Sequence, residues 1–190
     1  MKAFERVLAY LKDITGPLLD PLQFAYQANK SVDDAVNMGL HYILQHLDKP
    51  GTYARILFVD FSSAFTIIPD ILQNELTQLS VPTSIYSYIR RLSFADDITV
   101  IDFIPDGNEF AYRQEVEHLA VWCSRNNLEL NTLKTVEMTV DLRRNPPVLP
   151  LTIMNSTVSA VDSFKFLGIN ISQDLKWDIH IDSIVKKAQQ

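Results

Sequence analysis

Acidic residues stand at two places where the chain is expected to leave a strand or to turn between strands. Asp60 directly follows the apolar run 56–59, and Asp96 and Asp97 precede the alternating run 98–104. Hard divalent cations bind carboxylate oxygens, and a two-metal site holds its ions about 4 Å apart on rigid elements. These three residues would form such a site if the two strands are neighbours. The alternative at Asp96 and Asp97 is a solvated turn.

One lysine and two aromatic residues add to this chemistry. Lys134 lies just after the segment 128–131, and a lysine near transferred phosphates neutralises charge or protonates a leaving pyrophosphate. Phe61 and Phe65 enclose a segment of small residues and are candidates for the lining of a nucleotide pocket. The alternatives are a surface lysine in a turn and aromatic side chains that pack in the core.

Cysteine and histidine content argues against a zinc site. Cys123 is the single cysteine, and the four histidines share no ligand spacing, which excludes an internal disulfide and a Cys/His zinc module. Cys123 falls on the apolar face of an expected helix, so we expect a buried small hydrophobe and not a nucleophile. The chemistry of the chain is therefore expected to depend on carboxylates and lysine.

Composition bounds the class of protein. The 190 residues, 47% of them hydrophobic, predict one domain with a sizeable core. A formal net charge of −6 is the wrong sign for holding nucleic acid by overall charge, so any such contact must use local patches. There is no apolar run of membrane-spanning length and no signal-peptide core. These features predict an intracellular protein, in the nucleus or cytoplasm, without a membrane partner.

Hydrophobic periodicity predicts the helices that position these residues. Ser31 is a favourable N-cap with Asp34 three residues on, followed by a helical stripe of Val32, Val36, Leu40, Ile43, Leu44 and Leu47. A later long helix carries Tyr112, Val116, Leu119, Ala120 and Cys123 on one face and ends at 126–127. Further helices are expected from Pro69, from Pro82 through Leu92, and over 178–190.

Shorter apolar runs predict the strands. The run 56–59 is typical of a buried central strand, and 98–104 and 136–140 alternate in the manner of strands. Residues 151–153 precede an expected turn at 155–156, and 164–167 precede Gly168. Helices and strands in this order predict an α+β protein.

Five segments, in this order, resemble the reverse transcriptase of non-LTR (LINE-type) retrotransposons. They are 20–26 (Asp-Pro-Leu-Gln-Phe-Ala-Tyr), 58–65 (Phe-Val-Asp-Phe-Ser-Ser-Ala-Phe), 94–97 (Phe-Ala-Asp-Asp), 130–135 (Leu-Asn, then Lys-Thr) and 164–168 (Phe-Lys-Phe-Leu-Gly). The order of the five segments makes the resemblance specific, and it covers nearly the whole chain.

The resemblance implies a partial right-hand polymerase of the α+β class, with an antiparallel palm sheet backed by helices and most of the thumb missing. Residues 1–110 would form partial fingers and palm with the metal-site motifs, 111–171 the palm helix and primer-grip strands, and 172–190 the start of the thumb. The implied activity is RNA-directed DNA synthesis, with an RNA template and a DNA primer as partners and Mg²⁺ or Mn²⁺ as cofactor.

The resemblance also assigns roles residue by residue. Asp60 and Asp96 would be metal ligands, Asp97 the supporting carboxylate of the turn, and Lys134 the proton donor to pyrophosphate. Phe65 would be the gate that crowds a ribose 2′-hydroxyl, and Phe61 and Lys30 would join it in nucleotide binding. The primer grip would consist of Phe164, Lys165, Phe166, Leu167 and Gly168.

Departures from the family pattern predict impaired catalysis. A basic residue of the fingers is replaced by Gln27, and one residue is missing after Phe65. Asp60 and Asp96 are only 36 residues apart, because the segment with the template-positioning Gly-Ala-Pro-Gln-Gly motif is absent between Leu92 and Ser93. Residues 89–93 must then serve as a strand although 84–92 has a helical pattern, which predicts a poorly formed hairpin.

Two functions from different classes therefore remain open at this point. One is a reverse transcriptase-like polymerase domain, catalytically defective. The other is a non-catalytic retrotransposon remnant that at most binds nucleic acid or a partner.

Overall fold

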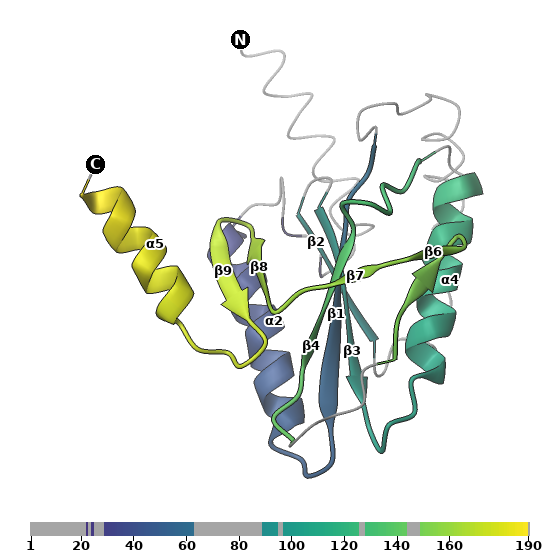
Figure 1. Ribbon diagram of the computed structural model, residues 1–190, viewed down its shortest axis with the longest axis horizontal. Helices are drawn as coiled ribbons and strands as arrows, with labels where there is room; N and C mark the ends of the chain where they lie inside the picture. Colours follow the sequence, from purple (N-terminus) through teal and green to yellow (C-terminus); the bar gives the residue numbers. More distant parts are fainter. Residues whose placement is uncertain are drawn as a thin grey trace.

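The computed structural model describes residues 22, 24, 29–62, 89–94, 97–125, 128–143 and 149–189. In these residues the chain is an α+β protein with a five-stranded sheet between helices α2 (Val32–Leu47) and α4 (Phe110–Arg125), and with a third helix, α5 (Asp178–Ala188) (Figure 1). None of the described helices has both the length and the hydrophobicity required to cross a bilayer.

The sheet has the strand order β2-β3-β1-β4-β7. Its strands are β1 (Tyr53–Val59), β2 (Ile89–Phe94), β3 (Asp97–Ile104), β4 (Val136–Val140) and β7 (Ser159–Ala160). Neighbouring strands are antiparallel except for β4 and β7, which run parallel. The expectation of a purely antiparallel sheet is therefore wrong at β7, and the sheet is mixed.

Strand β1 is the middle strand of the sheet, and helices cover both faces of the sheet. For this reason all seven of its residues are buried. Both β3 and β4 are antiparallel to β1, so they are parallel to each other. Helix α4 connects them, with β1 inserted between. This split β-α-β unit brings the end of β1 next to the start of β3 and the start of β4.

Strand β2 corrects two expectations. The local pattern predicts that 89–92 end a helix that begins at Pro82, whereas the resemblance requires 89–93 to be a strand, and residues 89–92 form part of strand β2. The β2–β3 hairpin, expected to be poorly formed, pairs without interruption from Ile89 opposite Asp102 to Phe94 opposite Asp97. The free edge of β3 needs hydrogen-bond partners for its backbone, and this pairing outweighs the local helical period. The helix expected from Pro69 lies outside the described residues.

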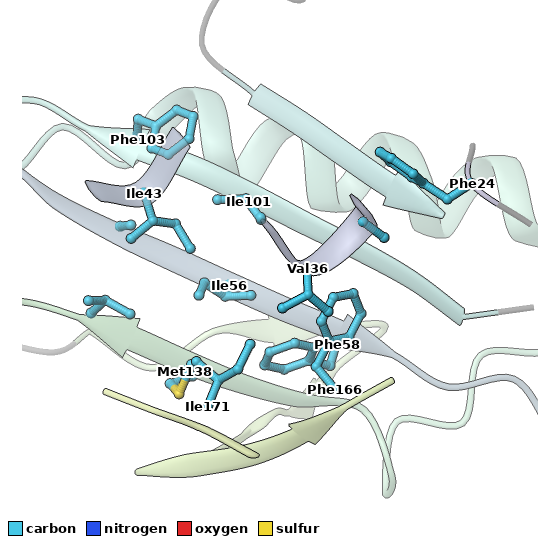
Figure 2. Packing of buried hydrophobic residues seen from close by; sticks show 13 residues of the cluster. Phe24, Val36, Ile43, Ile56, Phe58, Ile101, Phe103, Met138, Phe166 and Ile171 are labelled. Carbon is cyan, nitrogen blue, oxygen red and sulfur yellow. The ribbon is translucent and has the colours of Figure 1, made fainter. Parts of the chain in front are cut away.

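One face of the sheet packs against α2 and the hairpin formed by β8 (Ser163–Phe166) and β9 (Ile169–Ser172). Figure 2 shows Val36 and Ile43 of α2 above the side chains of β1, with Phe166 and Ile171 of the hairpin beside them. The predicted capping box is present, because Ser31 Oγ accepts the Asp34 amide and Asp34 accepts the Ser31 amide. Leu44, placed on the apolar stripe, is instead 52% exposed.

The opposite face packs against α4 and a short hairpin of β5 (Thr152–Ile153) and β6 (Ser156–Thr157). The predicted apolar face of α4 is confirmed, since all five of its residues are buried: Tyr112, Val116, Leu119, Ala120 and Cys123. Cys123 is thus a buried free cysteine, as expected. The turn of the β5–β6 hairpin falls at Met154 and Asn155, one residue earlier than expected, and both have positive φ.

The β8–β9 hairpin turns at Leu167 and Gly168, with φ angles of 49° and 92°. Two successive positive φ angles are the signature of a two-residue hairpin turn, which Gly168 adopts without steric cost. Helix α5 follows β9, contacts it, and extends away from the sheet with no buried residue (Figure 1). The hairpin itself is therefore the element that brings residues 164–166 back onto the sheet.

Candidate functional site

A cavity of about 260 Å³ opens where β1 ends. Three of the segments singled out in the sequence contribute to its wall, together with the start of β3. The lining residues are Phe58, Val59, Asp60, Ile98, Thr99, Lys134, Phe164 and Phe166. A larger groove of about 520 Å³ lies between α4 and the β5–β6 hairpin, and it contains none of the predicted site residues.

Asp60 is the carboxylate of this cavity, and its backbone is held from both sides. Its amide donates to Thr135 Oγ1 at 3.1 Å, and its carbonyl accepts the Asn131 amide at 2.9 Å. One residue later, Phe61 forms an isolated β-bridge with Leu130. The segment after β1 is therefore tied to the segment before β4, and Asp60 is half-buried at the junction.

Lys134 stands on the same junction, in the turn that precedes β4. Its amide donates to the Asn131 carbonyl at 3.1 Å, and the Thr135 amide donates to the same carbonyl at 2.8 Å. The side chain of Lys134 is exposed and lines the cavity with Asp60. Within the described residues, neither Asp60 nor Lys134 forms an ion pair. Asp60 and Lys134 therefore bring a carboxylate-bearing and an ammonium-bearing side chain to the wall of one cavity.

Aromatic rings form another wall of the cavity. Phe164 of β8 stacks on Phe58 of β1 with ring centroids 4.1 Å apart, and Phe166 lies at 5.6 Å from Phe58 with its ring tilted. These contacts fasten the hairpin to the sheet beside Asp60. Lys165, between the two phenylalanines, is exposed and does not line the cavity. Of the predicted primer-grip residues, Phe164 and Phe166 therefore reach the site, and Leu167 and Gly168 form the turn beyond it.

Other predicted site residues fall elsewhere. Phe61 is half-buried and packs against the core on the α4 side, so the core-packing alternative describes it. Lys30 lies with Nζ 4.9 Å from the centre of the Phe24 ring, and neither Phe61 nor Lys30 lines the cavity. Asp96 and Phe65 lie outside the described residues.

The described residues do not test the metal expectation, because Asp96 lies outside them. Asp97 is the first residue of β3, and its neighbour Ile98 lines the cavity, so the backbone of Asp97 lies next to a residue of the site. Asp60 supplies a hard oxygen ligand of the kind that Mg²⁺ prefers. No group of three His, Cys, Asp or Glu side chains that could hold a metal is present in the described part of the chain. Among the described residues that line the cavity, Asp60 is therefore the carboxylate that could bind such an ion.

Thr135 is a site residue that the sequence reasoning did not single out by itself. Its side chain is 1% exposed, and its hydroxyl accepts the amide of the candidate metal ligand. The available signal was its position directly after Lys134, at the start of a predicted strand.

A buried ionic network was also not anticipated. Arg55 donates to both Glu137 and Glu109, Tyr112 donates to Glu137, and Tyr53 donates to Glu109. Burial would raise the pKa of Glu109, but hydrogen bonds from Tyr53, Arg113 and Arg55 lower it below its usual value. The signal in the sequence was an arginine inside the apolar run of β1, which requires a buried partner.

No protein-family model matches this chain, and no curated protein matches it either. The site combines a carboxylate that can bind a cation with an ammonium group that can face phosphate oxygens, and its aromatic wall can face a sugar or base. This combination is chemically suited to a metal-bound phosphorylated nucleotide.

Proposed function

We propose that this chain is a reverse transcriptase-like domain derived from a non-LTR retrotransposon, whose ancestral two-metal nucleotidyl-transfer site is now catalytically defective. One observation carries the proposal: residues of three motifs, Asp60, Lys134 and Phe164, line one cavity although they are spread over more than half of the chain. Solvated turn residues and surface lysines have no reason to converge in this way. The family resemblance supplies the reaction, and the cavity supplies a place for it.

Each residue has a chemical role in this proposal. A bound divalent cation would neutralise phosphate charge, and Asp60 would bind it through a carboxylate oxygen. Lys134 would face the phosphate oxygens and hold the proton that a leaving pyrophosphate needs. The stacked rings of Phe58 and Phe164 would exclude water from one side of the nucleotide.

The catalytic defect follows from the segment that is missing between Leu92 and Ser93. The family uses this segment to position template and incoming nucleotide. Correct positioning lowers the barrier of a reaction by as much as roughly 7–11 kcal/mol. A site that binds a metal–nucleotide complex without this positioning is expected to keep affinity and to lose most of its rate.

The proposal is tested by measuring Mn²⁺-dependent deoxynucleoside triphosphate binding and primer extension on an RNA template. The variants are Asp60→Asn and Asp106→Asn, the latter an exposed turn residue that serves as the matched control. We expect binding by the wild type and by Asp106→Asn, a loss of roughly tenfold or more in Asp60→Asn, and extension near background in all three. The absence of Mn²⁺-dependent deoxynucleoside triphosphate binding by folded wild type would overturn the proposal. Rapid primer extension that requires Asp60 would show that the site is not catalytically defective.

The alternative is a non-catalytic retrotransposon remnant that at most binds nucleic acid or a partner. The missing segment between Leu92 and Ser93 favours it, because template contact is lost with that segment. Salt-sensitive RNA binding that is equal in wild type and Asp60→Asn, without nucleotide binding, would support this second function.

A further inference from the structure

We propose that Thr135 is a positioning residue for Asp60: its buried hydroxyl accepts the Asp60 amide and thereby sets the direction in which the Asp60 carboxylate enters the cavity. The inference deepens the proposed function and rests on it, because it concerns the same site.

The register between β1 and β4 changes at the cavity. Ladder pairing runs regularly from Ala54 opposite Val140 to Phe58 opposite Val136. The next contact pairs Phe61 with Leu130. Two residues on the β1 side, 59–60, thus face five residues on the other side, 131–135. The three extra residues form a bulge-like loop that carries Lys134, and the loop interrupts the backbone ladder beside Asp60.

This interruption leaves the Asp60 amide without a strand carbonyl opposite it. Backbone amides at such a place need another acceptor, and here the acceptor is a side chain: Thr135 Oγ1, at 3.1 Å. On the other side of the same residue, the Asp60 carbonyl accepts the Asn131 amide at 2.9 Å. Both peptide groups that flank the Asp60 side chain are therefore fixed by the loop that carries Lys134.

The environment of Thr135 gives this hydrogen bond little freedom. The side chain is 1% exposed, so water does not compete for the hydroxyl. The backbone of Thr135 is itself held, because its amide donates to the Asn131 carbonyl at 2.8 Å. A small rotation of the peptide before Asp60 would move the carboxylate relative to Lys134, and Thr135 opposes that rotation.

The test uses three variants of the full chain. Thr135→Val keeps the shape and removes the hydroxyl, and Thr135→Ser keeps the hydroxyl. Thr139→Val is the matched control, a half-buried threonine within β4, the strand that begins directly after Thr135. The measurements are the hydrogen-exchange rate of the Asp60 amide by NMR and the Mn²⁺ affinity from paramagnetic broadening of the Asp60 signal. Thr135→Ala gives the same comparison if Thr135→Val does not fold.

We expect Thr135→Val to speed exchange of the Asp60 amide and to weaken Mn²⁺ binding, each by roughly tenfold. Thr135→Ser should restore both values, and Thr139→Val should change neither. An unchanged exchange rate or an unchanged Mn²⁺ affinity in Thr135→Val overturns the positioning role. If wild type binds no Mn²⁺ while the Asp60 amide still exchanges faster in Thr135→Val, the proposed function is wrong and the hydrogen bond has a structural role only.

Discussion

Arg55 and Glu137 form a bidentate ion pair in the interior, with Arg55 Nε donating to Glu137 Oε1 at 2.8 Å and Arg55 Nη2 donating to Oε2. The two side chains are 1% and 3% exposed. They come from adjacent strands, 82 residues apart in sequence. The same guanidinium also reaches Glu109 at the start of α4, at 2.6 Å. One buried cation therefore connects β1, β4 and the beginning of α4.

Removing this cation is predicted to destabilise the fold strongly. Arg55→Met leaves Glu137 and Glu109 buried without their partner, and breaking such a buried pair lowers the free energy of unfolding by about 3–5 kcal/mol. Urea unfolding followed by circular dichroism measures the change. Arg113→Met is the control, because Arg113 is 36% exposed where it contacts Glu109, and we expect a loss of about 1 kcal/mol or less there. Equal losses in both variants would contradict the central role of Arg55.

Asp102 is predicted to make stability depend on pH. Burial raises its pKa to about 6, with a smaller opposing effect of the Phe103 amide and further raising by Glu109 and Glu115. The unfolded pKa is about 3.9, so between these values the folded state binds more protons than the unfolded state. The free energy of unfolding therefore falls by about 3 kcal/mol from Asp102 as the pH rises from 4 to beyond 6.

This pH effect is isolated by comparing wild type with Asp102→Asn. Other carboxyls titrate in the same range, and the pKa of Glu109 is lowered, which gives a slope of opposite sign. The difference between the two proteins removes these shared contributions. We expect Asp102→Asn to gain stability relative to wild type as the pH rises through 6. A difference that is constant from pH 4 to pH 7 would show that Asp102 is ionised normally in the folded protein.

The capping box at the start of α2 is predicted to contribute measurably. Ser31→Ala removes the hydroxyl that accepts the Asp34 amide at 3.2 Å, and loss of such a cap lowers stability by about 1 kcal/mol. Asn37→Ala, in the exposed middle of the same helix, should have the opposite sign because alanine has the better helix propensity. Thermal denaturation compares the two. A Ser31→Ala protein as stable as wild type would sink the prediction.

The stacked pair of Phe58 and Phe164 is predicted to hold the β8–β9 hairpin on the sheet. Phe164→Ala removes the 4.1 Å stack and leaves the hairpin attached through Phe166 and Ile171. We expect faster hydrogen exchange of the β9 amides, while exchange in β1 and β3 stays as in wild type. Phe164→Leu keeps an apolar contact, so its exchange rates in β9 should lie between those of wild type and of Phe164→Ala. Uniform acceleration through the whole sheet would mean that the hairpin does not open on its own.

Local pattern predicted some of the elements well, and the reason is visible in the residues. Ser31 with Asp34 forms the expected cap, and the face of α4 that carries Tyr112 and Cys123 is buried as expected. Both depend on interactions within a few residues and on an apolar stripe that any core would cover. Leu44 shows the limit, because the stripe of α2 is wider than the surface the sheet offers to it.

The sequence predicted which residues could belong to the candidate site, but not that they lie close together in space. The motifs named Asp60, Lys134 and Phe164, but their meeting in one cavity depends on a split β-α-β unit and on a hairpin that folds back onto β1. Thr135 belongs to the matched segment 130–135, but local pattern does not reveal its role, which arises from a register change between two strands. Such a change depends on which strands pair, and pairing is a long-range property.

The sequence by itself determined the α+β class, the cap of α2, the apolar face of α4 and the identity of the residues whose side chains could bind or react with a ligand. Only the tertiary structure decided that residues 89–94 form a strand, that Arg55 is paired in the interior, and that Asp60 and Lys134 line one cavity. The physical reason is the range of the interactions. Caps and apolar stripes are set by neighbours within one or two turns, whereas strand pairing, buried ion pairs and the register break at Asp60 are set by partners brought together only when the chain folds.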